Sequence, residues 1–203
     1  MRLGYKNVRL FPYGYQGWQA LKDPSKHKSL APTGPVEGDF FPKCRLAMLQ
    51  TGKDAAYLGI VPGSRYFSLS DIAGDYVLVE VYNEMCSLCL AELPHINRLL
   101  GLINKDPHLK SRIKLLGLGA GSTKRSVAKF RKKTGYDLLL FADQKWKTFG
   151  LLGKPVLPVL YLLKKDGGKG LRIMWRHAGG IGNPKEFLAH LKRYMKQEEG
   201  TAN

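Results

Sequence analysis

The stretch VLVEVYNEMCSLCLAELP, residues 77–94, decides the fold of this chain. It begins with β-branched apolar residues typical of a buried strand and passes through the polar turn Asn83-Glu84. Two cysteines separated by two residues come next, and apolar residues at helical spacing continue to about Asn104. The order strand, turn, helix therefore places a Cys-x-x-Cys pair at the beginning of a helix.

The chemistry of thiols explains why two cysteines would stand there. Unpaired backbone N–H groups and the helix dipole stabilise an anion at a helix N-terminus, which favours the reactive thiolate form of Cys86. Cys89 comes one helical turn later on the same side, close enough to attack a mixed disulfide on Cys86. Cys86 is the predicted nucleophile and Cys89 the predicted resolving cysteine. No cofactor is expected beyond this redox-active disulfide.

These residues resemble the thioredoxin superfamily, whose members show V-D-F-W-A-x-W-C-G-P-C at the same spacing. Glu80 matches the buried acid that serves the resolving thiol there; if buried, it would have a raised pKa and could act as a proton shuttle. The continuation CLAELP is similar to the C-x-x-C-x-x-E-L/F-P motif of the TlpA/ResA branch, also called redoxins, in which the acid matched by Glu92 sits near the cysteines. The alternatives are an edge-facing strand residue for Glu80 and an ordinary helix-surface residue for Glu92.

Three residues around the cysteines depart from the thioredoxin pattern. Met85 replaces tryptophan, and Ser87-Leu88 replaces Gly-Pro. Because the residues between the cysteines set thiolate stability, the reduction potential and the direction of electron flow do not carry over. Met85, Ser87 and Leu88 are predicted to contact a substrate.

Leu157-Pro158 stands immediately before an apolar strand, where thioredoxin-like proteins carry a cis-proline. The resemblance implies a cis bond, with the Leu157 backbone offered to a bound substrate strand and Pro158 keeping the edge beside Cys86 clear. Pro155 is the competing candidate, farther from the strand.

The rest of the chain completes an α/β pattern. Strands are predicted at residues 76–82, 112–117, 138–141, 159–164 and 171–176, and helices at 123–134, capped by Ser122, at 143–149, and from Asn183-Pro184 onward. This order matches a thioredoxin-like fold, a central mixed β-sheet flanked by helices, with an N-terminal extension.

Four segments are predicted along the chain: a rhodanese-like remnant (1–22), a linker and N-terminal extension (23–64), the thioredoxin-like domain (65–197) and a tail (198–203). GYKNVRLFPYGYQGWQA, residues 4–20, resembles the end of a rhodanese domain, whose catalytic cysteine would lie upstream, so no sulfurtransferase activity is expected. The chain would then be a fragment of a longer fusion; an ordinary extension is the alternative. Residues 39–63 contain Cys44, a predicted bystander thiol, and apolar pieces that fit a helix or hairpin covering the main domain.

Charge and hydropathy bear on partners and location. The 33 Lys and Arg residues against 16 Asp and Glu give a net charge of +17, which favours acidic partners, with a merely solubilising surface as the alternative. No nucleic-acid motif accompanies this charge. No apolar run approaches the ~20 residues that span a bilayer, and the first residues lack a signal-peptide core. The resemblance implies a periplasmic or otherwise extracytoplasmic location, with the cytoplasm as the alternative.

The predicted function is that of a thiol:disulfide oxidoreductase acting on disulfide-containing proteins and regenerated by an upstream thiol reductant. The resemblance extends this to apocytochromes, and so to cytochrome c maturation. A thiol peroxidase is the nearest rival, but Val79 and Asn83 stand where peroxiredoxins need proline and a hydroxyl. A non-catalytic basic binding module remains open. A structural zinc site would need four ligands, with only Cys44 and scattered histidines left over, so no metal is predicted.

Overall fold

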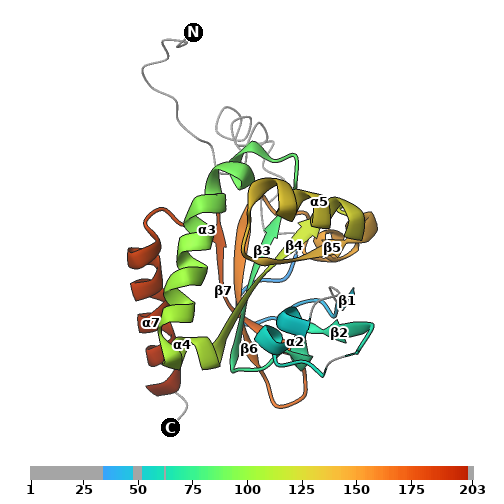
Figure 1. The fold of residues 1–203 in the computed structure, drawn as a ribbon. Helices are drawn as coiled ribbons and strands as arrows, with labels where there is room; N and C mark the ends of the chain where they lie inside the picture. Colours follow the sequence, from blue (N-terminus) through green and yellow to red (C-terminus); the bar gives the residue numbers. More distant parts are fainter. Residues whose placement is uncertain (1–33, 48–51, 62, 201–203) are drawn as a thin grey trace, which may run out of the picture.

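A computed structural model describes residues 34–47, 52–61 and 63–200 (Figure 1). The predicted rhodanese-like remnant, residues 23–33, 48–51 and 62 of the predicted linker and extension, and the last three residues lie outside the described residues. The main sheet has five strands in the order β5-β4-β3-β6-β7. Their bounds are β3 Tyr76–Tyr82, β4 Ile113–Ala120, β5 Leu139–Asp143, β6 Val159–Lys165 and β7 Leu171–Ala178. β3 pairs parallel with β4 and antiparallel with β6, so the predicted mixed sheet is confirmed.

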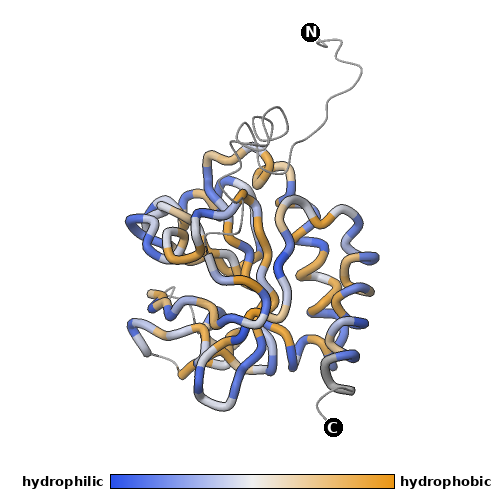
Figure 2. The backbone as a smooth tube through the Cα atoms, turned by 180° about the vertical axis from the view of Figure 1, so that it is seen from behind, coloured by the Kyte–Doolittle hydropathy of each residue, from blue (hydrophilic) through white to orange (hydrophobic). Residues whose placement is uncertain are grey.

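The central strand β3 is buried along its whole length. A strand covered on both faces reads as a nearly continuous apolar run, which is why its seven residues hold a single charge. Its side chains alternate between two cores: Tyr76, Leu78 and Tyr82 belong to one, and Val77, Val79 and Val81 to the other. Figure 2 shows the hydrophobic stretches gathered in the strands and the hydrophilic ones in loops and on outer surfaces.

Three long helices cover the first face: α3 Ser87–Lys105, α5 Lys124–Thr134 and α7 Pro184–Gly200. The crossovers β3-α3-β4 and β4-α5-β5 run in the same direction across the sheet, and connections of one hand place both helices on one face. Gly117 of β4 makes room beneath them, because a Cβ there would lie 2.5 Å from the Leu140 side chain and 3.2 Å from the Tyr82 ring. The Tyr82 ring stacks on Phe130 of α5, with centroids 5.6 Å apart.

The second face is covered by part of the predicted extension together with α6 Lys147–Leu151. β1 Arg45–Ala47 pairs antiparallel with β2 Tyr66–Ser68, and the helix α2 Gly52–Leu58 lies between them in the chain. Phe41 packs edge-on against Tyr161 of β6, and Phe67 packs edge-on against Phe141 of β5. Of the two alternatives for residues 39–63, the described part contains the helix, whereas β1 pairs with β2 beyond residue 63 and forms no hairpin within that range.

The same extension pairs with the outer edge of β7. The Gly38 and Phe41 amides donate to the carbonyl oxygens of Ile173 and Leu171, both at 2.8 Å, and the Ile173 amide donates to the Asp39 carbonyl at 2.8 Å. These bonds satisfy backbone groups that an open sheet edge would leave exposed.

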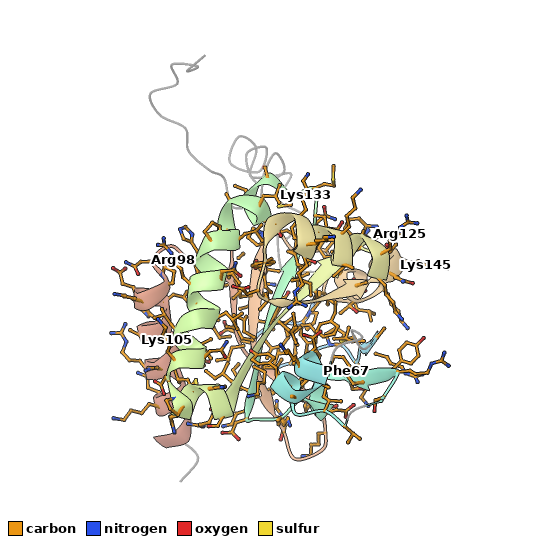
Figure 3. All side chains as sticks on the ribbon, viewed as in Figure 1. Phe67, Arg98, Lys105, Arg125, Lys133 and Lys145 are labelled. Carbon is orange, nitrogen blue, oxygen red and sulfur yellow. The ribbon has the colours of Figure 1, made fainter. Side chains whose placement is uncertain are left out.

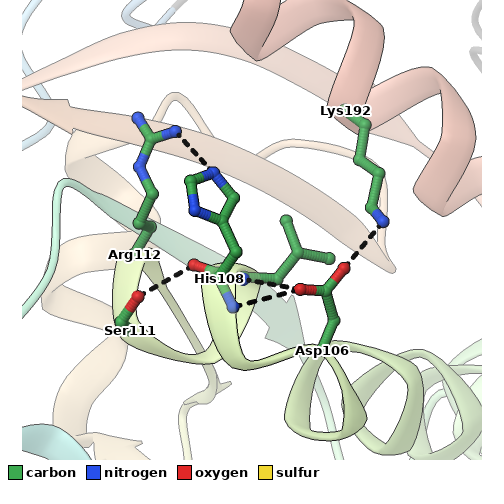
Figure 4. A network of polar contacts seen from close by, with 6 residues as sticks. Asp106, His108, Ser111, Arg112 and Lys192 are labelled. Carbon is green, nitrogen blue, oxygen red and sulfur yellow. Dashed lines mark hydrogen bonds and ion pairs between the residues drawn. The ribbon is translucent and has the colours of Figure 1, made fainter.

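A short helix that the sequence analysis did not predict, α4 Pro107–Arg112, connects α3 to β4. Asp106 caps it by accepting hydrogen bonds from the His108 and Leu109 amides at 3.1 and 3.2 Å (Figure 4). The same carboxylate meets the Lys192 ammonium of α7 at 2.8 Å. One residue thus starts α4 and ties it to the last helix.

Several predicted boundaries were wrong. The cap of α5 is Thr123 and not Ser122, because Thr123 has the extended backbone of a cap and its Oγ1 accepts from the Ser126 amide at 3.1 Å. The predicted helix 143–149 begins too early: Asp143 ends β5, a 3-10 turn η3 Gln144–Trp146 follows, and only then does α6 begin. β4 continues to Ala120, beyond the predicted end at 117, and α7 continues to Gly200, into the predicted tail.

None of the helices in the described ranges is both long and apolar enough to cross a bilayer.

Candidate active site

The turn between β3 and α3 is built around Asn83. Its side chain accepts from the Met85 amide at 2.9 Å and donates to the Ala120 carbonyl of β4 at 2.8 Å. Its carbonyl accepts from the Cys86 amide at 3.1 Å. These bonds fix the chain at the point where it leaves the sheet, so that α3 begins immediately after Cys86.

Cys86 is the cap of α3, and its sulfur takes part in the capping. The Cys89 amide donates to the Cys86 Sγ at 3.2 Å. This bond gives a partner to one of the amides that a helix N-terminus leaves without an intrahelical acceptor. Cys86 is half-buried, whereas Cys89 is 2% exposed, so only the first sulfur can be reached by a macromolecular substrate.

The surroundings of Cys89 disfavour the ionised form of its thiol. Burial raises the pKa of the Cys89 thiol far above its ordinary value, and the neighbouring Cys86 and Glu80 groups raise it further. Both cysteines are present as free thiols. The pair therefore combines an accessible thiol at a helix N-terminus with a buried thiol that needs a proton acceptor in order to ionise.

The Leu157-Pro158 peptide bond is cis, which confirms the prediction and excludes Pro155 from that role. The Leu157 carbonyl oxygen lies 3.9 Å from the Cys86 Sγ. Pro158 is buried at the start of β6, and its carbonyl accepts from the Gly179 amide at 2.8 Å. The bend thus faces the thiol from a neighbouring strand.

Glu80 is fully buried, so the alternative of an edge-facing exposed acid is excluded. Tyr136 donates its hydroxyl to Glu80 Oε2 at 2.5 Å, while Oε1 meets no hydrogen-bond partner within the described part of the chain. Burial raises the pKa of Glu80 to about 7; the Tyr136 hydrogen bond opposes this shift and the charge of Glu92 adds to it. Near neutral pH, Glu80 is poised between its two protonation states.

Glu92 is also buried, at 6% exposure, and not a helix-surface residue. Its Oε1 accepts from the Ile181 amide at 2.7 Å, and its Oε2 lies 3.3 Å from the His95 ring nitrogen Nδ1. A Cβ at Gly180 would stand 2.5 Å from Glu92 Oε2, so a glycine lets the loop after β7 close over this carboxylate. Glu92 therefore joins the active-site helix to that loop.

Exposed apolar side chains surround the reachable thiol. Met85 is 89% exposed and Leu88 51%, on either side of Cys86 in the chain, and Ser87 between them is also exposed. Val156, just before the cis peptide bond, is 49% exposed. Such a surface suits an apolar segment of another protein.

No protein-family model matches this chain. In sequence it is similar to the thiol-disulfide oxidoreductase ResA of Geobacillus thermodenitrificans, at 25% identity over 103 residues, which cover 51% of this chain and 56% of that protein. ResA of Bacillus thuringiensis matches at 26% over 121 residues, covering 59% and 66%. The chain thus spans 56 to 66% of the length of these curated relatives.

Solved structures share the arrangement of the sheet and helices. The thioredoxin domain of a thiol-disulfide oxidoreductase from Bacteroides vulgatus aligns with a TM-score of 0.56 and 16% identity, covering 79% of this chain and 99% of that one. The fold is thioredoxin-like. StoA from Bacillus subtilis aligns with a TM-score of 0.52 and 16% identity, covering 76% of this chain and 98% of that one.

Within the thioredoxin-like domain, the structure brings most of the predicted site residues to one end of the sheet. Cys86, Cys89 and Leu157 are joined by the contacts above, and Glu80 lies within electrostatic range of Cys89. Tyr136 was missed, because its bond to Glu80 connects residues 56 positions apart and no local pattern announces it.

Cys44 stands apart from this site. It packs beside the second core, and burial raises the pKa of its thiol to about 12, so that it stays protonated and inert at neutral pH. Within the described ranges, no group of three or more His, Cys, Asp and Glu side chains gathers as a metal site.

Proposed function

We propose that this chain is a thiol:disulfide oxidoreductase that reduces or exchanges disulfides of partner proteins through Cys86 and Cys89. The observation that carries the proposal is the Cys86 sulfur at the cap of α3, accepting the Cys89 amide and facing the cis Leu157-Pro158 bend. The sequence relatives named thiol-disulfide oxidoreductases support it.

In the reducing direction the reaction has two exchange steps. The Cys86 thiolate attacks one sulfur of the partner disulfide, forming a mixed disulfide and releasing the other partner sulfur as a thiolate, which takes a proton. Cys89 then loses its proton and attacks the Cys86 sulfur, which releases the second partner thiolate. Two electrons and two protons pass to the partner, and an upstream thiol reductant must reduce the new Cys86–Cys89 disulfide.

The second step requires a base, because the Cys89 thiol is held protonated by its burial. We assign that role to Glu80, whose pKa of about 7 lets it accept a proton near neutral pH and return it in the reverse reaction. Glu92 is assigned a supporting role, since its negative charge raises the pKa of Glu80 and so strengthens that base.

The partner would lie across the apolar surface beside the thiol. Met85, Ser87 and Leu88 would contact its side chains, and the Leu157 backbone before Pro158 would pair with its main chain. Oxidised extracytoplasmic proteins, with apocytochromes among them, are the substrate class that the resemblance to the TlpA/ResA branch favours, in a compartment where disulfides form.

The decisive experiment is the equilibrium reduction potential of the Cys86/Cys89 pair in glutathione or dithiothreitol buffers, with Cys86→Ser as the control. A potential near or below about −250 mV would support a reductant of partner disulfides, and one near about −120 mV an oxidant that donates its own disulfide. Absence of any reversible two-thiol couple would overturn the proposal.

A trapping experiment tests the order of the two steps. The Cys89→Ser variant should accumulate a mixed disulfide between Cys86 and a partner, because the resolving thiol is missing. The Cys86→Ser variant should accumulate none, since Cys89 is 2% exposed. Equal trapping by both variants would contradict the assignment of Cys86 as the nucleophile.

A further inference from the structure

A positively charged cleft of about 460 Å³ opens between β1, the first turn of α5 and the residues after β5. We call it the basic cleft and define it by Arg45, Tyr66, Lys124 and Lys147, all exposed. Figure 3 shows Arg125 and Lys145 projecting outward in the same region, from α5 and from the turn after β5.

The cations of this cleft form no ion pair with a described carboxylate, unlike several basic residues on other surfaces. On other surfaces Arg112 meets Asp75 at 2.7 Å, Arg172 meets Asp166 at 2.5 Å and Lys192 meets Asp106 at 2.8 Å. No described carboxylate forms an ion pair with Arg45, Lys124 or Lys147. Their charge is therefore available to a ligand.

The single acid lining the cleft forms no ion pair with these cations. Asp143 is 4% exposed, and its two oxygens accept from the Thr148 and Phe149 amides at 2.8 Å each. Arg45 and Lys124 instead share one aromatic ring: the guanidinium carbon lies 4.4 Å and the ammonium 5.5 Å from the Tyr66 centroid. Both cations thus lie close to the Tyr66 ring, and an anion bound near that ring would interact favourably with both charges.

Direct contacts link the basic cleft to the active-site turn. Ser126, in the first turn of α5, donates to the Glu84 carboxylate at 2.8 Å, two residues before Cys86. Trp146, which directly precedes Lys147 of the basic cleft, provides a second contact between the two regions. Its ring packs against Gly121 at the end of β4, next to the Ala120 carbonyl that Asn83 binds.

The backbone around Trp146 is unusual. Trp146 and its neighbour Lys145 both adopt φ of 58°, in the left-handed region that costs free energy for residues other than glycine. That conformation leaves the indole 48% exposed. An exposed tryptophan held in this way offers an apolar contact beside a row of cations.

We infer that the basic cleft docks an acidic segment of the partner protein, next in sequence to the disulfide that the partner presents to Cys86. The inference rests on the proposed function and names its partner class. The apolar part of that segment would lie on Met85 and Trp146, and its carboxylates would enter the cleft between Arg45 and Lys124. Charge complementarity of this kind raises association rates and selects partners.

The test compares two peptides that each contain one disulfide and differ only in the flanking residues, three Asp in one and three Asn in the other. Reduced wild-type protein should reduce the acidic peptide about tenfold faster, in second-order rate constant, at low ionic strength. This preference should shrink at about 200 mM salt, where the Debye length is below about 8 Å.

Two charge-reversal variants locate the effect. Arg45→Glu/Lys124→Glu should lose or invert the preference for the acidic peptide. Lys169→Glu/Lys196→Glu changes the net charge equally, at exposed positions in the β6-β7 turn and on α7, and should keep it. A loss of preference in both variants would show steering by net charge alone and would overturn the inference, as would equal rates for the two peptides with wild-type protein.

Two further measurements separate this inference from other outcomes. Hydroxyethyl disulfide carries no acidic segment, so its reduction by wild type tests the proposed function itself. Failure to reduce it would contradict the proposed function. A normal rate with this compound but no preference between the two peptides would contradict only the docking inference. Arg45→Gln/Lys124→Gln keeps the stems of both side chains and should weaken the preference without reversing it. Binding of anionic vesicles or duplex DNA that is lost in Arg45→Glu/Lys124→Glu, but that leaves reduction of the acidic peptide by wild type unchanged, would assign the cleft to another ligand and overturn the inference.

Discussion

Glu80 is an acid in a place built for apolar side chains. It stands in the middle of β3, fully buried, with one hydrogen-bond donor on one oxygen and none among the described residues on the other. Because an ionised carboxylate is poorly solvated there, the folded protein holds the proton more tightly than the unfolded chain does. That difference couples the stability of the fold to pH.

The Glu80→Gln variant should be more stable than wild type above neutral pH. The folded pKa of about 7 lies above the ordinary value of 4.5, so wild-type stability falls as pH rises from 4.5 to 7 and then levels off. The full penalty is about 3 kcal/mol, at ~1.4 kcal/mol per pKa unit. Urea unfolding at pH 4 and pH 8 measures it: the two proteins should agree at pH 4 and diverge at pH 8. Parallel pH curves would contradict the buried-acid assignment.

The Tyr136→Phe variant should shift the pH dependence of the resolving step. Tyr136 stabilises the ionised form of Glu80, so its removal raises the pKa of that acid further, by about one unit for a hydrogen bond to a charged group. In stopped-flow reduction of a peptide disulfide, the rise of the rate with pH should move upward by the same amount. Tyr82→Phe is the matched control, because the Tyr82 hydroxyl has no hydrogen-bond partner in the described structure. An unshifted pH profile for Tyr136→Phe would contradict the assignment of Tyr136 as the residue that tunes the pKa of Glu80.

Among the elements, α4 shows how many contacts a single residue at a helix N-terminus can make. Asp106 accepts two amides of the first turn and pairs with Lys192 of α7, so the cap also joins two helices of the first face (Figure 4). The Lys192 ion pair and the two amide bonds lower the pKa of Asp106. Its contribution is therefore present above the unfolded pKa and is lost as pH falls through the lowered folded value.

Two substitutions separate the cap from the ion pair. Asp106→Ala removes both and should lower the melting temperature more than Asp106→Asn, which keeps an acceptor for the two amides and removes only the charge. Thermal unfolding at low and high salt checks this. Salt should reduce the difference between wild type and Asp106→Asn, and should leave the difference between the two variants largely unchanged. Equal melting temperatures for the two variants would show that the amide bonds add nothing.

The elements around the thiols could be predicted because their signals are local. The apolar run of β3, the spacing of Cys86 and Cys89 and the apolar face of α3 lie within one stretch of sequence. The cis bond at Pro158 was predicted from the resemblance to thioredoxin-like proteins and not from a physical signal in the sequence. Tyr136 was out of reach, because its partner is distant in sequence, and Thr123 was missed because two adjacent hydroxyl residues are equivalent caps by composition.

At the scale of the whole molecule, the described part of the extension belongs to the domain. The predicted boundary at residue 65 separates segments that share a core, since Phe41 and Leu46 are both buried against the sheet. Composition gave no warning of this, because a segment rich in Pro and Gly is also the usual signature of a linker. Its contribution arises from pairing with β7, at the other end of the chain.

Phe41→Ala should destabilise the protein by about 3 kcal/mol, as expected for a large-to-small substitution of a buried aromatic side chain. Phe40→Ala is the neighbouring control: Phe40 is 41% exposed and rests under the Arg172 guanidinium at 4.7 Å, so its loss should cost less than about 1 kcal/mol. Chemical denaturation of both variants measures the difference. Similar costs would mean that the extension is only loosely attached.

The pairing of the extension with β7 also has a consequence during synthesis. Arg172 donates to the Gly38 carbonyl across 134 residues of chain, and the backbone bonds beside it span a similar separation. At ribosomal rates of roughly 5 to 20 residues per second, the early segment waits on the order of ten seconds before its partner strand is made. Through that interval Phe41 has no sheet to pack on, so the nascent chain displays an apolar segment that a chaperone could hold until the last hairpin emerges.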